Sequence, residues 1–180
     1  MNRPPIAIRP ARLDEAQALA ALIVRSVRAL QAGDYTPAQL DGALGSVFGV
    51  DRQLILDGSY FVAEIDGAMA GCGGWSRRRT LYGADAVADR NDAELTPGVD
   101  AARIRAFFVE PRFARQGVGA ALLAACEAAA IAYGFTALEL GATLTGLPLY
   151  SRYGYVAVEH AEAPLPNGLT LAIVRMAKTV

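Results

Sequence analysis

The sequence predicts one α+β (mixed α/β) domain that spans residues 1–180, and three observations support this fold class. A length of 180 residues suits a single domain that buries its own core. Hydrophobic residues make up 53% of the chain and charged residues 19%, which favours a globular protein over a disordered one. Strand-like and helix-like segments are interleaved, with hairpin-like strand pairs toward both ends.

The first part of the chain is expected to hold a strand followed by two helices. Residues 6–9 ("IAIR") have the pattern of a short strand. Apolar residues then recur at helical spacing over residues 19–30 and indicate one apolar helix face. Gly33 ends this helix. Thr36 followed by Pro37 predicts the start of a second helix, as N-cap and first helical residue.

A hairpin and a long excursion are expected next. Residues 60–65 and 68–75 have strand patterns, and the turn dipeptide Asp66-Gly67 joins them. Residues 76–100 carry three consecutive arginines and then several acids. Loops of this length inside a compact domain are usually functional or mobile, so we expect this segment to leave the sheet.

The second half of the chain is expected to hold the strongest strand and a buried helix. In residues 101–109, Ile104, Ala106 and Phe108 share one face of the strand by alternation. Residues 119–133 are apolar almost all round, which predicts a helix buried across a sheet face. Four shorter elements complete the order: strand 135–140, helix 146–154, and strands 155–160 and 168–177.

Net charge, apolar runs and cysteine content bear on the expected partners and cellular location of the protein. The formal net charge is −1, so we predict neither a nucleic acid nor an anionic membrane as partner. The N-terminal stretch lacks the apolar core of a signal peptide, and no run approaches the roughly 18 apolar residues of a membrane span. Cys72 and Cys126 are expected to be free, buried and reduced, in a cytoplasmic protein.

The stretch "RQGVG", residues 115–119, carries the clearest functional signal. A P-loop would need Lys and Ser or Thr after the glycines, and a dinucleotide fingerprint would need three glycines directly after the strand. A simple turn into a buried helix explains one glycine but not two beside several arginines. Because the first N–H groups of a helix bind anions and glycines let backbone approach a phosphate, we expect a pyrophosphate site at Gly117 and Gly119.

The segment "FFVEPRFARQGVGAALL", residues 107–123, resembles the acyl-CoA binding motif of the GNAT superfamily of N-acetyltransferases. The order of the expected elements is similar to that family over essentially the whole chain. The resemblance implies a GNAT fold: a central, mostly antiparallel sheet of about seven strands flanked by about four helices, with a splayed parallel strand pair at the acyl-CoA site. It also implies acetyl-CoA as the cosubstrate.

The same resemblance assigns the contacts to acetyl-CoA. The family pattern has Gln or Arg three residues before the first glycine, where this chain has Ala114, so the backbone contacts remain and that side-chain contact does not. The backbone of Phe107 and Val109 would bind the pantetheine arm, and the N–H groups from Arg115 to Ala120 would hold the pyrophosphate. Core packing is the alternative for the two phenylalanine side chains, and by alternation Phe108 is expected in the core. The implied binding residues are Phe107, Phe108, Val109, Arg115, Gln116, Gly117, Val118, Gly119 and Ala120.

A second motif, "LPLYSRYGY" at residues 147–155, is similar to the C-terminal signature of the family and matches Tyr150 to the tyrosine that protonates the departing thiolate. A phenol with a pKa of about 10 keeps its proton until a thiolate, of pKa about 8.5, needs it. The alternative is a tyrosine packed at a helix–sheet junction. Thr143 stands where the family often has an asparagine, and that role is not carried over.

The sequence leaves several candidates for the general base that would deprotonate the amine. Glu64, Glu110 and Glu139 lie near strand ends, with solvated surface carboxylates as the alternative, and a water chain is a further route. His160, the single histidine, is expected to be structural. An acyl-cysteine would lack a paired histidine nearby, and the wide spacing of cysteines and histidine predicts no metal site.

In a GNAT fold the amine acceptor approaches from the side opposite the coenzyme. Tyr35, Trp75 and residues 76–100 would line its entrance, and Arg77 with the next two arginines would bind a carboxylate or the 3′-phosphate, unless the loop is simply solvated. The resemblance thus implies an acetyl-CoA-dependent N-acetyltransferase that acts on a primary amine of a small molecule or peptide by direct transfer. A non-catalytic acyl-CoA sensor or scaffold is the alternative, and a homodimer, as in many relatives, stays open.

Overall fold

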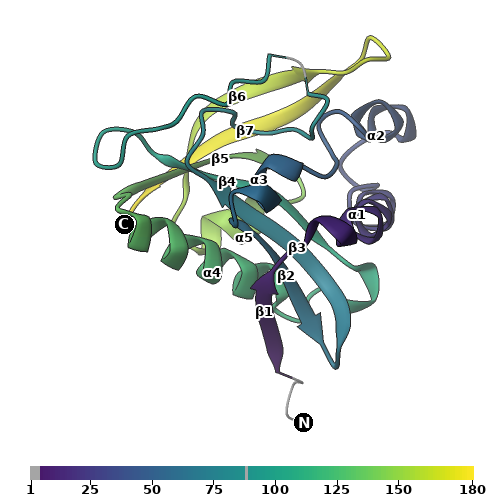
Figure 1. Ribbon diagram of the computed structural model, residues 1–180. Helices are drawn as coiled ribbons and strands as arrows, with labels where there is room; N and C mark the ends of the chain where they lie inside the picture. The colour runs from purple at the N-terminus through teal and green to yellow at the C-terminus, as the bar shows by residue number, and fades with distance from the viewer. Residues whose placement is uncertain (1–4, 88) are drawn as a thin grey trace.

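Figure 1 shows the computed structural model of the chain, which describes residues 5–87 and 89–180; the first four residues of the N-terminal stretch lie outside it. Seven strands form one sheet in the order β1-β2-β3-β4-β5-β7-β6. The strands are β1 Ile6–Pro10, β2 Tyr60–Ile65, β3 Ala68–Ser76, β4 Ala102–Val109, β5 Ala137–Thr143, β6 Val156–Pro164 and β7 Thr170–Thr179. The α-helices are α1 Ala16–Leu30, α2 Pro37–Ala43, α3 Arg52–Leu56, α4 Val118–Tyr133 and α5 Leu147–Arg152.

The predicted fold class is confirmed. Neighbouring strands are antiparallel except for the parallel pair of β4 and β5. Helix α4 covers one face of the sheet, and α1 and α2 lie on the other side (Figure 1). The core is divided in the same way, with Leu22 and Leu40 in one cluster and Leu123 and Cys126 of α4 in another. In the described part of the chain, no helix is long and apolar enough to cross a bilayer.

Most predicted elements are present, and one helix was not predicted. Thr36 caps α2 by accepting a hydrogen bond from the Gln39 N–H at 3.2 Å. Helix α3 has five residues, which is too short for helical periodicity to be visible in the sequence. Its N-cap is Asp51, whose Oδ1 accepts a hydrogen bond from the Gln53 N–H at 3.0 Å.

Strands β4 and β5 are paired over only two positions. Ala102 pairs with Leu138 and Arg103 with Glu139, although both strands continue. Beyond this point residues 104–109 of β4 do not pair with residues 140–143 of β5. We call the space between these two stretches the wedge. The splayed parallel pair expected from the family resemblance is therefore present.

A β-bulge in β4 changes which side chains face which helix. The register between β3 and β4 shifts near Gly73, and Ala106 has a φ of +57°. The prediction that Ile104, Ala106 and Phe108 share one face is wrong, because the extra residue reverses the alternation beyond it. Ile104 and Phe107 pack in the cluster under α4, whereas Phe108 is buried in the cluster under α1 and α2.

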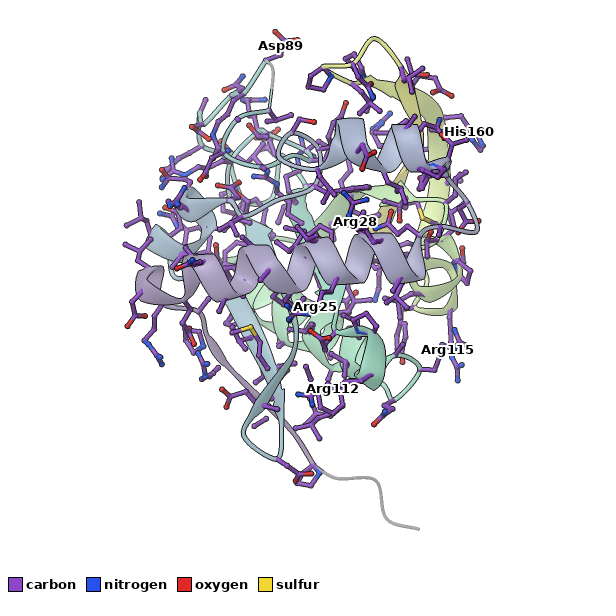
Figure 2. All side chains as sticks on the ribbon, turned by 90° about the vertical axis from the view of Figure 1, so that its right-hand side faces the viewer. Arg25, Arg28, Asp89, Arg112, Arg115 and His160 are labelled. Atoms are coloured by element: carbon purple, nitrogen blue, oxygen red, sulfur yellow. The ribbon has the colours of Figure 1, made fainter. Side chains whose placement is uncertain are left out.

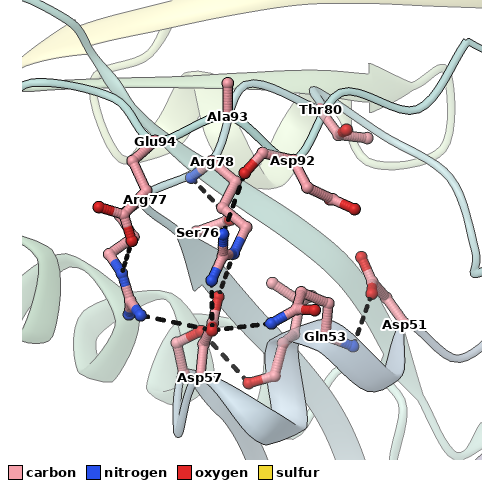
Figure 3. A network of polar contacts seen from close by, with 12 residues as sticks. Asp51, Gln53, Asp57, Ser76, Arg77, Arg78, Thr80, Asp92, Ala93 and Glu94 are labelled. Carbon is pink, nitrogen blue, oxygen red and sulfur yellow. Dashed lines mark hydrogen bonds and ion pairs between the residues drawn. The ribbon is translucent and has the colours of Figure 1, made fainter.

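The segment 76–100 is anchored to α3 by a buried carboxylate (Figure 3). The Asp57 side chain is 5% exposed and accepts two hydrogen bonds from Arg78, at 2.7 and 2.9 Å, and one from Gln53 at 2.9 Å. Burial alone would raise the pKa of Asp57, but the hydrogen bonds from Arg78 and Gln53 outweigh it and lower the pKa. The segment thus leaves the sheet, as predicted, but is held to the rest of the fold.

We expect Asp57→Asn to lower the free energy of unfolding by about 1–3 kcal/mol at neutral pH, because it removes a buried acceptor of charged hydrogen bonds. Since the folded state holds the pKa of Asp57 low, this contribution is present above the ordinary carboxyl pKa of about 4 and is lost as the pH falls through the lowered value. Urea unfolding at neutral and acidic pH measures both effects.

Asp41→Asn is the matched control. Asp41 pairs with Arg28 at 2.9 Å, but both side chains are more than half exposed. Its replacement should change the free energy of unfolding by less than about 0.5 kcal/mol. Equal losses in the two variants would contradict an anchoring role for Asp57.

Candidate active site

A small cavity lies in the wedge. Its volume is about 60 Å³, and its lining includes Ala106 and Phe107 of β4, Gly141 of β5, Tyr150 of α5 and Tyr82 of the 76–100 segment. A Cβ atom on Gly141 would lie 3.2 Å from the Tyr82 ring, so Tyr82 packs directly over this part of β5. We call this space the wedge cavity.

Tyr150 lies at the wedge cavity and is 9% exposed. Its ring packs edge-on against Phe107, with centroids 6.2 Å apart, and against Tyr155 at 5.9 Å. Burial raises the pKa of Tyr150 well above that of a free phenol, so the hydroxyl stays a proton donor at neutral pH. Thr143, nearby, accepts a hydrogen bond from the Gly146 N–H at 3.1 Å and so stabilises the turn before α5.

The glycine stretch forms the start of α4, as predicted. Gly117 is the N-cap with a φ of +94°, a backbone conformation that side chains other than glycine adopt only with strain. The first N–H groups of α4, from Val118 to Ala120, have no partner within the helix and carry the positive end of its dipole. Gly119 leaves room for Leu149 of α5, which a Cβ atom would approach to 3.1 Å.

Two arginines lie beside this helix start. Figure 2 shows Arg112 and Arg115 at the segment that leads into α4, with Arg25 and Arg28 on α1 beside it. Arg25 is ion-paired with Glu110 at 2.8 Å, whereas the Arg112 guanidinium lies 4.6 Å from the centre of the Phe113 ring. The helix start is therefore positively charged by its backbone and by neighbouring side chains.

The three strand residues predicted to bind the coenzyme all lie on the part of β4 that borders the wedge. Phe107 and Phe108 line the wedge cavity, and Phe108 is 6% exposed and packs edge-on against Phe48. The Val109 N–H donates a hydrogen bond to Oγ of the buried Ser26 at 3.1 Å. Sequence reasoning missed Ser26, although a serine on the apolar face of α1 was a visible signal.

A larger cleft adjoins the wedge cavity on the side of the 76–100 segment. Its volume is about 490 Å³, and its walls come from Ser46 and Val47, from residues 79–82, 86, 87, 89 and 91, and from residues 164–166. Val47, Leu81 and Tyr82 line both spaces. The cleft is therefore the neighbour of the wedge cavity across these three side chains, and no residue from 115–120 lines it. We call this larger space the entrance cleft.

A family model described as an acetyltransferase (GNAT) domain matches residues 57–157. The match covers more than half of the chain and includes the wedge, the start of α4 and Tyr150. The chain belongs to the GNAT acetyltransferase family.

Solved structures of other GNAT proteins share the fold. A GCN5-related N-acetyltransferase from Rhodopseudomonas palustris is 24% identical, with a TM-score of 0.73, over 100% of this chain and 98% of that one. The PaiA N-acetyltransferase from Thermoplasma acidophilum, in complex with coenzyme A, is 13% identical with a TM-score of 0.68, over 98% and 99%. A ribosomal-protein-alanine N-acetyltransferase from Brucella melitensis is 17% identical with a TM-score of 0.64, over 97% and 99%. No curated protein sequence gives a significant match.

Of the residues predicted to line the acceptor entrance, part of the 76–100 segment, including Arg79, lines the entrance cleft, whereas Tyr35, Trp75 and Arg77 do not. The Tyr35 hydroxyl donates to the Ala172 carbonyl at 2.7 Å and accepts from the Leu144 N–H at 2.8 Å, so it links three segments. Trp75 packs under α4, and Arg77 is bonded to carboxylates beside α3. None of the three lines the wedge cavity or the entrance cleft.

The acids considered as general base are also placed away from the wedge cavity. Each of the three glutamates is ion-paired with arginine from another element, and the histidine lies exposed on the edge strand β6. The pairs are Glu64 with Arg9, Glu110 with Arg25, and Glu139 with Arg103 and Arg175; the histidine is His160. A base for the acceptor amine is therefore not supplied by these side chains in this arrangement.

Both cysteines are free and buried. Burial raises the pKa of Cys72 to about 12 and that of Cys126 further, so neither is a thiolate at neutral pH. Within residues 5–87 and 89–180, no group of three or more His, Cys, Asp or Glu side chains is placed to hold a metal ion.

Proposed function

We propose that this GNAT protein is an N-acetyltransferase that moves the acetyl group of acetyl-CoA to a primary amine by direct transfer. The observation that carries the proposal is the wedge, which has the buried Tyr150 at its cavity. The start of α4, with its free N–H groups, packs at Gly119 against Leu149 of the same helix α5 that carries Tyr150. The coenzyme A complex of the Thermoplasma relative supports the assignment of the coenzyme.

The residues present fit acetyl-CoA. The start of α4 offers N–H groups, a helix dipole and two arginines, which suit a pyrophosphate. The edge of β4 over residues 104–108, which has no partner strand in β5, would offer backbone groups to an extended pantetheine arm, as an added strand would use them, whereas the Val109 N–H is already bonded to Ser26. Bound acetyl-CoA would supply the activated acetyl group as a thioester.

Tyr150 would act as the general acid. The lone pair of the amine forms the new C–N bond with the acetyl carbon while the C–S bond breaks, and the leaving thiolate takes the proton of the Tyr150 hydroxyl. The proton lost by the amine nitrogen passes to water, and Tyr150 regains its proton from solvent. Holding amine and thioester together in the wedge would supply most of the rate enhancement.

Replacing Gly117 with Glu should weaken acetyl-CoA binding ~100-fold, because a carboxylate at the start of α4 repels a pyrophosphate and blocks its approach. Isothermal titration calorimetry with acetyl-CoA measures the change. The wild type is expected to bind in the micromolar range, on the order of 1–100 μM.

Gly98→Glu is the matched control for backbone strain. Gly98 has a φ of +79° and open space around its Cβ position, but it lies in the 76–100 segment. Its replacement should leave acetyl-CoA binding within about twofold of the wild type. Wild-type protein without affinity for acetyl-CoA, or equal losses in the two variants, would refute the anion site at "RQGVG".

Tyr150→Phe should lower kcat ~100-fold, since it removes the proton donor but keeps the ring packed against Phe107. The dissociation constant for acetyl-CoA should stay within about threefold. Steady-state assays of thiol release with an amine panel, together with calorimetry, separate the two effects.

Tyr153→Phe serves as the control because Tyr153 follows the same helix but is 39% exposed. Its kcat should match the wild type. An unchanged kcat in Tyr150→Phe would remove Tyr150 from the mechanism. Tight binding of acetyl-CoA without transfer to any amine would favour a sensor over an enzyme.

A further inference from the structure

The wedge cavity contains a buried amide oxygen without a partner. Gln31 lines the cavity and is 7% exposed, and no described group hydrogen-bonds to its Oε1. Its backbone is fixed at the end of α1, where its N–H donates to the Val27 carbonyl at 3.1 Å and its carbonyl accepts from the Tyr35 N–H at 3.2 Å. Because a buried acceptor left unpaired costs stability, Oε1 calls for a donor from a ligand.

A buried cation lines the same cavity. Arg105 is 3% exposed, and its Nη2 donates to the Gly83 carbonyl at 2.7 Å. Its Nη1 lies 2.7 Å from Oδ2 of Asp51, a carboxylate that also accepts a hydrogen bond from Arg90 at 3.0 Å. One carboxylate is thus shared by two guanidinium groups, and it is Arg105, not Asp51, that lines the cavity.

The other titratable groups of the cavity are two phenols. Tyr82 comes from the 76–100 segment and Tyr150 from α5, and burial raises the pKa of both. Helix α1, strands β5 and β7 and residues 47–48 contribute no ionisable side chain to the lining. Among the described residues, then, no carboxylate or histidine lines the cavity to stabilise an ammonium ion.

These groups select the protonation state of the attacking nitrogen. An alkylammonium ion in the wedge cavity would lose its hydration and meet the like charge of Arg105, and both effects favour the neutral amine. A neutral amine has the lone pair needed for attack and an N–H to donate to Gln31.

We propose that the wedge cavity is the subsite that binds the amine group of the acceptor. Gln31 Oε1 accepts a hydrogen bond from the amine N–H, and the positive charge of Arg105 favours binding of the neutral amine over the ammonium ion. The inference rests on the proposed acetyl transfer. The ammonium proton is lost to bulk water before entry, so no basic side chain in the wedge is needed to form the free amine. The second proton, which the nitrogen releases after the C–N bond forms, passes to water, while Tyr150 protonates the leaving thiolate.

Because the amine must bind in its neutral form, the cavity favours one class of acceptor. Weakly basic primary amines, such as aromatic amines, are already neutral at neutral pH and enter without deprotonation. The entrance cleft fits an apolar body attached to the nitrogen, because most of its lining is apolar. That lining includes Val47, Leu81, Tyr82, Val87, Pro164 and Leu165.

The test compares aniline with 2-phenylethylamine as acceptors, with acetyl-CoA as donor, between about pH 6 and pH 9. For 2-phenylethylamine, kcat/KM should rise ~tenfold per pH unit toward the pKa of the amine itself, about 10 for an alkylamine. For aniline it should stay nearly flat. A plateau for 2-phenylethylamine near neutral pH would overturn the free-base subsite, because a basic group of the protein would then be taking the proton.

Two substitutions at Gln31 test the hydrogen bond and the charge. Gln31→Leu should lower kcat/KM for both amines by ~10- to 100-fold while the dissociation constant for acetyl-CoA is unchanged. Gln31→Glu keeps an acceptor oxygen and places a carboxylate in the cavity with Arg105. It should raise the ratio of kcat/KM for 2-phenylethylamine to that for aniline at neutral pH by ~tenfold.

Gln39→Leu on α2 is the matched control. Gln39 makes capping hydrogen bonds with Thr36 and lines neither the wedge cavity nor the entrance cleft, so its replacement should leave kcat/KM unchanged. An unchanged kcat/KM in Gln31→Leu, or an unchanged ratio in Gln31→Glu, would overturn the inference while acetyl transfer stands. Wild-type protein that acetylates neither amine nor any other amine would overturn the proposed function itself.

Discussion

Arg103 of β4 and Glu139 of β5 form an ion pair at the last position where these two parallel strands are bonded. Glu139 also pairs with Arg175 of β7, which in turn pairs with Glu159 of β6, so a ladder of alternating charges crosses four strands. Beyond it the strands separate, and the backbone edge of β4 is left without a neighbour. Tyr150, the strand part of the proposed coenzyme site and the proposed amine subsite all lie in this separation.

Groups from distant parts of the chain shape the wedge and cover it. The bulge at Ala106, whose carbonyl accepts a hydrogen bond from the Tyr60 hydroxyl at 3.0 Å, places Phe107 in the same layer as Ile104 and Phe108 in the opposite layer. Arg105 is bonded to Gly83 of the 76–100 segment, which holds that segment over the wedge. A buried guanidinium is expensive to desolvate. Its place at the cavity fits a role in choosing the acceptor as well as in holding the segment.

Local patterns in the sequence predicted most elements and the glycine start of α4, where the proposal places the coenzyme. The helix cap at Thr36, the hairpin turn and the glycines before α4 depend on neighbouring residues, so they are visible in a single sequence. The bulge, the short helix α3 and the proposed amine subsite are not, because they depend on contacts between distant segments. Arg105 and its partner Asp51 are far apart in the chain, and Gln31 becomes informative only when its side chain is found buried without a partner. Tyr35 was predicted at the acceptor entrance because it stands beside a loop signal. Its hydroxyl instead forms hydrogen bonds with the backbone of Ala172 and Leu144.

Hydrogen–deuterium exchange with and without acetyl-CoA tests most directly whether the wedge and the start of α4 form one coenzyme site. We predict slower amide exchange on binding in both residues 104–109 and residues 115–120, because one ligand would bond to the edge of β4 and to the N–H groups of the helix. Exchange in the edge strand β6 should be unchanged. Protection confined to the entrance cleft or to β6, with residues 104–109 and 115–120 unaffected, would contradict this account.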